Sequence, residues 1–260
     1  MATADDQVLA RDLAQEAGEL LLGLRSDGGG PDELRQAGDR QSHEFLMARL
    51  AAVRPADAVL SEEGTDDKAR LAADRVWIVD PLDGTREFGE AGRADWAVHV
   101  ALWERAAGDG TGELTAGAVA LPAQGKVLNT LDPPSRTVPA ASAPSASLRL
   151  VVSRTRASQL VKDVAALLGA ELVPCGSAGA KAATVIMGET DVYLHSGGFY
   201  EWDTAAPVVV ARAAGLHASR IDGASLVYNR DDPLLPDILI CRPVIAGQLL
   251  DAIQEVTHAH

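Results

Sequence analysis

The stretch Trp77-Ile78-Val79-Asp80-Pro81-Leu82-Asp83-Gly84-Thr85 decides how this chain is interpreted. Its apolar beginning predicts a buried strand, and Asp80 follows at the end of that strand. Pro81 would fix the exit of the backbone, and Asp83-Gly84 is typical of a turn. We therefore expect two carboxylates, three residues apart, at a strand end, which is where α/β proteins place their chemistry.

The same turn is expected to offer free backbone N–H groups. Gly84 and Thr85 would open the next helix, so their N–H groups have no partner inside it. Carboxylates beside free N–H groups suit a divalent cation bound next to a phosphate. An ordinary Asp-Gly turn after a buried strand is the alternative interpretation, and this stretch alone does not separate the two.

Two other segments supply carboxylates at the ends of predicted elements. The run Val59-Leu60-Ser61-Glu62-Glu63-Gly64 is a short strand that ends in two glutamates, and Asp203 precedes a helix of small apolar residues. Alone, the first also fits a solvated turn and the second an ordinary helix N-cap. Packed together, these carboxylates would repel one another without cations. An oxygen-rich set without histidine favours Mg²⁺, with Mn²⁺ as a substitute.

The remaining periodicity predicts a layered α/β protein. An amphipathic helix is expected from Asp5 to Arg25, ended by the glycine-rich run 26–31, and a second helix from Asp39 to Val53. Helices that alternate with strands cover sheets in layered α/β folds. Strands are expected at 59–60, 76–79, 97–102, 114–121, 148–152, 172–173, 191–194 and 238–241, and helices at 157–168, 178–187, 204–214 and 244–253.

Residues 132–147 are rich in Pro, Ser and Ala and are interpreted as a connection between two lobes. The first lobe, 1–131, would carry most of the predicted metal-binding motifs. The second lobe, 148–260, would complete the metal site and bind substrate.

Composition excludes several classes of protein. The chain has 260 residues, 47% of them hydrophobic, which argues against disorder. Its formal charge of −14 argues against nucleic-acid binding, which needs a broad basic face. Cys175 and Cys241 are interpreted as reduced thiols. Neither a signal peptide nor an apolar run long enough to cross a membrane is visible, so we expect a cytoplasmic protein without membrane association.

Three motifs together resemble a known superfamily. Leu60-Ser61-Glu62-Glu63, Asp80 to Thr85 and Trp202-Asp203-Thr204-Ala205-Ala206 are similar to the signature motifs of the inositol monophosphatase-like superfamily of Mg²⁺-dependent, lithium-sensitive phosphatases. Asp39, 23 residues before Glu62, stands where that superfamily has an aspartate at the start of a helix. The resemblance covers nearly the whole chain. It implies the αβαβα sandwich of inositol monophosphatase and fructose-1,6-bisphosphatase, with a metal cleft between two lobes.

The resemblance also implies a catalytic arrangement. Two or three Mg²⁺ ions would be held, and Li⁺ and Ca²⁺ would inhibit. Thr85, held by Asp39, would orient or deprotonate a water made acidic by the metal near Glu62, without a covalent intermediate. The N–H groups of Gly84 and Thr85 would bind phosphoryl oxygens. The implied metal ligands are Glu62, Asp80, the carbonyl of Leu82, Asp83 and Asp203.

The spacing also separates this pattern from that of another phosphatase class. Haloacid-dehalogenase-type phosphatases use a nucleophilic Asp with a second Asp two residues on. Asp80 and Asp83 are three apart, so that arrangement does not fit.

A branch of the superfamily is indicated by the residues after Thr85. Arg86-Glu87-Phe88 is similar to the Lys-Glu-Phe of the CysQ type, whose members hydrolyse 3′-phosphoadenosine 5′-phosphate (PAP), whereas inositol-directed members have Thr-Asn-Phe. Residues 152–156 and 176–181 resemble further elements of that branch. An arginine for histidine at Arg156 and the pair Gly197-Gly198 depart from its pattern.

The branch implies a small-molecule substrate, a nucleotide bisphosphate. PAP, and also 3′-phosphoadenylyl sulfate, would lose the 3′-phosphate in sulfur assimilation, with AMP formed from PAP. The uncleaved phosphate needs cations, and adenine needs a flat apolar partner. Each cation proposed below could instead be an ordinary surface charge, and each aromatic residue could instead pack in the core. The candidates are Arg86, Arg154, Lys181, Arg156 and Arg230 for phosphate, and Tyr228 and Phe199 for adenine.

Two rival functions stay open at this point. The same chemistry could act on inositol monophosphate or fructose 1,6-bisphosphate. A non-catalytic nucleotide or metal sensor is the rival from another class, although the complete carboxylate set and Thr85 argue against a decayed site. Relatives are commonly homodimers, so a homodimer is expected.

Overall fold

Two five-stranded sheets organise the computed structural model, which describes residues 2–107, 111–134 and 147–258. Sheet A has its strands in the order of the sequence, β1-β2-β3-β4-β5. Its first pair is parallel and the others are antiparallel. The strands are β1 (Ala58–Ser61), β2 (Arg75–Asp83), β3 (Ala97–Arg105), β4 (Gly112–Leu121) and β5 (Lys126–Asn129).

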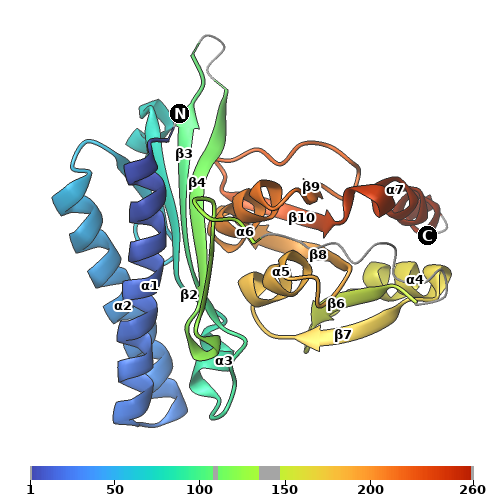
Figure 1. Cartoon of the computed structure of the whole chain (residues 1–260), viewed down its shortest axis with the longest axis horizontal. Coiled ribbons are helices and arrows are strands. Elements are labelled where there is room, and N and C mark those ends of the chain that lie inside the picture. Colours follow the sequence, from blue (N-terminus) through green and yellow to red (C-terminus); the bar gives the residue numbers. More distant parts are fainter. Residues whose placement is uncertain (1, 108–110, 135–146, 259–260) are drawn as a thin grey trace.

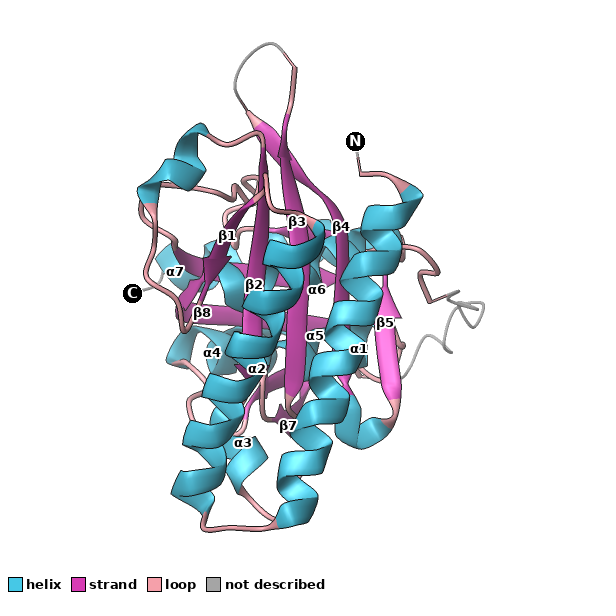
Figure 2. Ribbon diagram, turned by 90° about the vertical axis from the view of Figure 1, so that its left-hand side faces the viewer, coloured by secondary structure: helices cyan, strands magenta, loops and turns pink. Residues whose placement is uncertain are grey.

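The two N-terminal helices cover the outer face of sheet A (Figure 2). Helix α1 (Ala4–Asp27) confirms the first predicted helix. Leu13 and Leu21 of α1 are completely buried and belong to the same core cluster as Trp77 of β2. Fully burying such a leucine contributes about 1.5–3 kcal/mol.

Helix α2 (Pro31–Val53) begins eight residues earlier than the sequence predicted. Pro31 fits the first turn of a helix, where its missing N–H needs no partner, and Asp32 and Glu33 favour the positive end of the helix dipole. The glycine run before Pro31 therefore ends one helix while the proline starts the next. Asp39 consequently lies inside α2 and not at its start, which corrects the prediction.

Sheet B has the strand order β7-β6-β8-β10-β9. β6 is parallel to β7 and β8, and β10 is antiparallel to β8 and β9. The strands are β6 (Arg149–Ser153), β7 (Glu171–Cys175), β8 (Val192–Tyr200), β9 (His217–Ser219) and β10 (Leu234–Cys241).

Helices fill the space between the sheets and cover the far side of sheet B (Figure 1). α5 (Ala178–Ile186) and α6 (Glu201–Ala213) lie between the two sheets, and α4 (Gln159–Leu168) and α7 (Pro243–His258) lie outside sheet B. The layers therefore run αβαβα, which confirms the predicted fold. Short helical turns are α3 (Thr85–Gly89), η1 (Lys68–Ala72) and η2 (Pro122–Gln124).

Several elements differ from their predicted bounds. β2 continues through Asp83, with a pairing irregularity between Asp80 and Asp83, so neither aspartate lies beyond the strand. α6 starts at Glu201, because the carboxylate of Asp203 accepts the N–H of Tyr200 at 2.7 Å and closes the first turn. Asp203 is thus inside the first turn and not before it.

Two short strands, β5 and β9, were not predicted. Most of the predicted connection, 135–146, falls outside the described residues. Within the described ranges, none of the helices combines the length and apolar character needed to cross a bilayer.

Candidate active site

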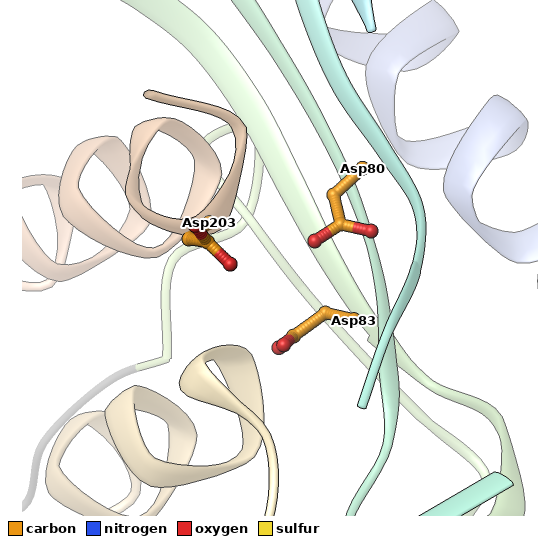
Figure 3. A group of neighbouring side chains, drawn as sticks. All are labelled: Asp80, Asp83 and Asp203. Carbon is orange, nitrogen blue, oxygen red and sulfur yellow. The ribbon is translucent and has the colours of Figure 1, made fainter. Parts of the chain in front are cut away.

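Three aspartates from the two halves of the chain converge where β2 faces the start of α6 (Figure 3). Asp80 and Asp83 come from β2, and Asp203 comes from α6. One carboxylate oxygen from each lies within 4.8 Å of the others. Asp80 and Asp83 are 1% and 6% exposed, so their charges are largely removed from water. The sequence predicted all three, and the structure brings them together.

Asp83 is held by the N-terminus of α5. Its two oxygens accept the N–H groups of Ala178 at 3.1 Å and Gly179 at 2.5 Å. A Cβ on residue 179 would lie 2.1 Å from Nε2 of His99, so only glycine fits there. Burial by itself would raise the pKa of Asp83, but His99, Lys181 and the Gly179 N–H hold that pKa below its ordinary value.

His99 of β3 is a site residue that the sequence interpretation missed. Its imidazole is completely buried, with Nε2 3.2 Å from Asp83 Oδ2 and Nδ1 3.1 Å from the carbonyl oxygen of Trp202. Burial opposes a charged ring, yet the Asp83 carboxylate raises the pKa of His99. Nδ1 donates to the Trp202 carbonyl and Nε2 lies within ion-pair distance of Asp83, so the ring connects sheet A to α6. Its one signal in the sequence is a histidine inside an apolar strand.

The other carboxylates raise one another's pKa. Burial is the main cause and neighbouring carboxylates add to it, raising the pKa of Glu62 to about 7 and that of Asp203 to about 6. Burial, together with the charges of Glu62 and Asp83, also raises the pKa of Asp80 well above its ordinary value. Asp80 and Asp83 are buried, Asp203 is partly buried, and Glu62 is exposed and lies outside the group of three. Acidic groups this close together require protons or cations. An all-oxygen set of this spacing fits Mg²⁺, which prefers carboxylate ligands.

Thr85 stands beside this cluster at the start of α3. Its hydroxyl lies 3.1 Å from Asp39 Oδ1 and 3.1 Å from the carbonyl oxygen of Leu82. Burial is the main cause that raises the pKa of Asp39 to about 6. Gly84 has a left-handed φ of 85°, and a Cβ there would lie 2.7 Å from Cβ of Ser177. A glycine is therefore required between Asp83 and Thr85.

The segments that indicated the CysQ branch meet in space. Arg154 Nη2 lies 2.8 Å from Glu87 Oε1 and 3.0 Å from Glu90 Oε1. Arg86, whose side chain is 60% exposed, also pairs with Glu90. These ion pairs place two guanidinium groups beside α3 and the residue that follows it.

Lys181 is not a surface cation. It is 4% exposed, and its amine donates to the carbonyl oxygens of Gly176 and Ser177. It also lies 5.5 Å from the ring centre of Tyr193. Burial lowers the pKa of Lys181, while Asp83 opposes that shift.

Of the two aromatic candidates for adenine, Tyr228 lies in the core, as the alternative interpretation had it. Tyr228 is 4% exposed, and its hydroxyl donates to Thr204 Oγ1 at 3.2 Å. Its ring belongs to the core between the sheets, so it is not available to stack on a base. Phe199 is partly buried and stacks on His195, with 3.9 Å between ring centres. Arg230 donates its backbone N–H to Glu201 Oε1 at 2.8 Å.

Comparison with known proteins agrees with this geometry. The model of the inositol monophosphatase family matches residues 5–258. A curated relative, the 3′-phosphoadenosine 5′-phosphate phosphatase of Mycobacterium leprae, is 52% identical over 98% of this chain and 96% of its own.

Two solved structures share the fold. CysQ from Bacteroides thetaiotaomicron has a TM-score of 0.73 and 29% identity, covering 92% of this chain and 97% of its own. Inositol monophosphatase-II from Staphylococcus aureus has a TM-score of 0.80 and 19% identity, covering 98% of both chains.

Proposed function

The chain belongs to the inositol monophosphatase family, and we propose that it is a Mg²⁺-dependent phosphatase that hydrolyses the 3′-phosphate of PAP to give AMP. The observation that carries the chemistry is the convergence of Asp80, Asp83 and Asp203 beside Thr85. The choice of PAP is supported by the relative of M. leprae, which is named for this reaction.

The metal set would consist of Glu62, Asp80, the carbonyl of Leu82, Asp83 and Asp203, holding two or three Mg²⁺ ions. Bound there, the ions would supply positive charge that makes a water acidic and neutralises the leaving oxygen. The raised pKa values of Glu62, Asp80 and Asp203 support this assignment, because a cation relieves the repulsion that causes part of the shift.

Thr85 and Asp39 would orient the attacking water. The Thr85 hydroxyl donates its one proton to Asp39 or to the Leu82 carbonyl, so its lone pairs would remain to accept from water. Backbone N–H groups of Gly84 and Thr85, at the start of α3, would bind phosphoryl oxygens. Glu62 would act on the attacking water indirectly, as one of the metal ligands.

The cations beside α3 would select the substrate. Arg154 and Arg86 would contact the phosphate that is not cleaved, exchanging part of their pairing with Glu87 and Glu90 for it. Lys181 would act on the same pocket indirectly, by holding the turn formed by Gly176 and Ser177. We do not assign adenine to Tyr228, because its ring is buried.

Finer properties follow from the family resemblance. We propose inhibition by Li⁺ and by Ca²⁺, which is larger and tolerates irregular geometry, so it would fill the site without aligning the water. Mn²⁺ would substitute for Mg²⁺. A homodimer, a cytoplasmic location, a role in sulfur assimilation and a second substrate, 3′-phosphoadenylyl sulfate, belong to the same proposal.

A substrate panel tests the function. Phosphate release would be measured from PAP, 3′-phosphoadenylyl sulfate, inositol 1-phosphate and fructose 1,6-bisphosphate, with Mg²⁺ and with EDTA. We expect the highest kcat/KM on PAP, loss of activity in EDTA, and loss in Asp203→Asn, which excludes a contaminating phosphatase. A higher kcat/KM on an inositol or sugar phosphate would show that PAP is not the preferred substrate. Full activity in EDTA would contradict the metal-dependent mechanism. Binding of PAP and Mg²⁺ without hydrolysis would favour the alternative of a non-catalytic nucleotide or metal sensor.

A further inference from the structure

A completely buried arginine, Arg70, fixes the segment that follows Glu62 along the chain. Its side chain is 0% exposed. Arg70 lies in η1, and its guanidinium binds Asp66 at both oxygens, with Nε 2.6 Å from Oδ1 and Nη2 2.9 Å from Oδ2. A planar guanidinium that contacts a carboxylate twice sets both position and orientation.

The same guanidinium also contacts Asn229 and Arg230, which lie 159 and 160 residues further along the chain. Nη1 donates to the side-chain oxygen of Asn229 at 2.8 Å, and Nη2 donates to the carbonyl oxygen of Arg230 at 2.8 Å. The amide of Asn229 donates back to the carbonyl oxygen of Arg70 at 3.3 Å. Arg70 therefore joins the chain near sheet A to the chain that leads into β10.

Glu201, the first residue of α6, holds this segment from the opposite side. Glu201 is 0% exposed, and its Oε2 and Oε1 accept the N–H groups of Asn229 at 2.7 Å and Arg230 at 2.8 Å. Asn229 has a φ of 58°, and within the described ranges no other non-glycine residue has a positive φ. A left-handed residue held by side chains on both sides forms a fixed link between η1 and α6.

We propose that Arg70 is a positioning residue for the metal site: through Asn229, Arg230 and Glu201 it holds the first turn of α6, and so Asp203, against the carboxylates of Asp80 and Asp83. The reason is electrostatic. These carboxylates repel one another, and Asp203 belongs to a different layer from the other two, so a rigid link is needed to keep the set assembled. A buried ion pair is costly to desolvate, so its presence here needs a reason other than stability. Fixing one arrangement of the chain is such a reason. The proposal rests on the proposed metal-dependent function.

The test compares two variants of the link with a matched control. Arg70→Lys keeps the charge but loses the double contact, and Asn229→Gly keeps the left-handed backbone while removing the amide contacts with Arg70. The control is Arg220→Lys, because Arg220 also contacts one carboxylate twice, with 2.7 Å to each oxygen of Asp237, but within the sheet B half. Mg²⁺ binding would be measured by calorimetry without substrate, together with the Mg²⁺ dependence of PAP hydrolysis and the melting temperature.

We expect Arg70→Lys and Asn229→Gly to weaken Mg²⁺ binding about tenfold or more, as mutation of residues that orient metal ligands does. kcat should recover at high Mg²⁺, and Arg220→Lys should bind Mg²⁺ as the wild type does although its melting temperature falls. Wild-type Mg²⁺ affinity in Asn229→Gly would overturn the proposal, and this holds even where Arg70→Lys fails to fold. A wild type that binds Mg²⁺ but does not hydrolyse PAP would overturn the proposed substrate alone, since the binding measurement still tests Arg70.

Discussion

The hydroxyl of Thr85 lies 3.1 Å from Asp39 Oδ1, and this contact joins the first residue of α3 to the interior of α2. The same hydroxyl is 3.1 Å from the carbonyl oxygen of Leu82. Thr85 is thus fixed by two acceptors from different segments. Its remaining lone pairs are available to a water beside the aspartate cluster.

Thr85→Val should remove this hydroxyl while keeping the shape of the side chain. We expect kcat on PAP to fall about 10²–10⁴-fold, the range for removing a positioned proton-transfer group, with little change in Mg²⁺ binding. Thr85→Ser is the control, because it keeps the oxygen and should keep most of the turnover. Near wild-type kcat in Thr85→Val would show that the hydroxyl only joins α3 to α2.

Gly84→Ala and Gly125→Ala should separate backbone strain from steric contact. Both glycines have positive φ, 85° and 64°, but a Cβ at 84 would lie 2.7 Å from Ser177 Cβ, whereas nothing lies within 4 Å of one at 125. We expect Gly125→Ala to lose about 1–2 kcal/mol in the free energy of unfolding, and Gly84→Ala about 2–5 kcal/mol together with activity. Urea unfolding measures both, and equal losses would mean that the contact relaxes freely.

Without divalent ions, stability should decrease as pH rises from about 4 to 7. The folded pKa values of Glu62 and Asp203 are about 7 and about 6, against ordinary values of 4.5 and 3.8. The folded state therefore binds more protons than the unfolded chain in this window, so the free energy of unfolding falls with rising pH. Melting in EDTA across this range checks the direction.

Mg²⁺ should reverse this trend, because it binds the ionised carboxylates. The rise in melting temperature on adding Mg²⁺ should be larger at pH 8 than at pH 5. Asp203→Asn is the control, since it removes one of the repelling charges and should flatten the pH slope in EDTA. A slope of the opposite sign in the wild type would mean that these carboxylates are ionised without a cation.

Arg154→Ala should raise KM for PAP more than KM for inositol 1-phosphate. A charge-assisted phosphate contact contributes roughly 1.5–3 kcal/mol, so the preference for PAP should fall about ten- to a hundredfold. Arg149→Ala is the matched control, because Arg149 is the first residue of β6, the strand that Arg154 follows, and its side chain is 47% exposed. Equal losses on the two substrates would assign Arg154 to the fold through Glu87 and Glu90.

Lys181→Met should affect both substrates alike. The amine is buried and hydrogen-bonded to the carbonyl oxygens of Gly176 and Ser177, so its loss should disturb the turn beside Asp83. We expect a lower melting temperature and a similar fall in kcat/KM for PAP and inositol 1-phosphate. A fall in kcat/KM for PAP alone would instead show that Lys181 contacts the uncleaved phosphate directly.

The aspartate cluster could be predicted because its signals are local. Each motif combines carboxylates with a predicted strand end or helix start, and the resemblance of the motifs to one superfamily groups them into one site. The layered fold followed for the same reason. The start of α2 was missed because the glycines before Pro31 indicated only the end of α1.

The residues that join the layers could not be predicted in this way. His99 contacts a carbonyl 103 residues away, and Arg70 contacts a side chain 159 residues away, so no local pattern marks either contact. The buried positions of Lys181 and Tyr228 were missed for a related reason. The identity of a polar or aromatic residue does not show whether tertiary packing buries its side chain.

The strand order of sheet A has a consequence for synthesis on the ribosome. Its strands follow one another along the chain, so each strand can pair with the one before it as the chain emerges. Its inner face, which includes Leu60, Ile78 and Ala101, is buried against residues such as Val208 of α6, which emerge much later. Until then the nascent chain exposes an apolar sheet face and an incomplete set of carboxylates, so this interval is when it most needs a chaperone.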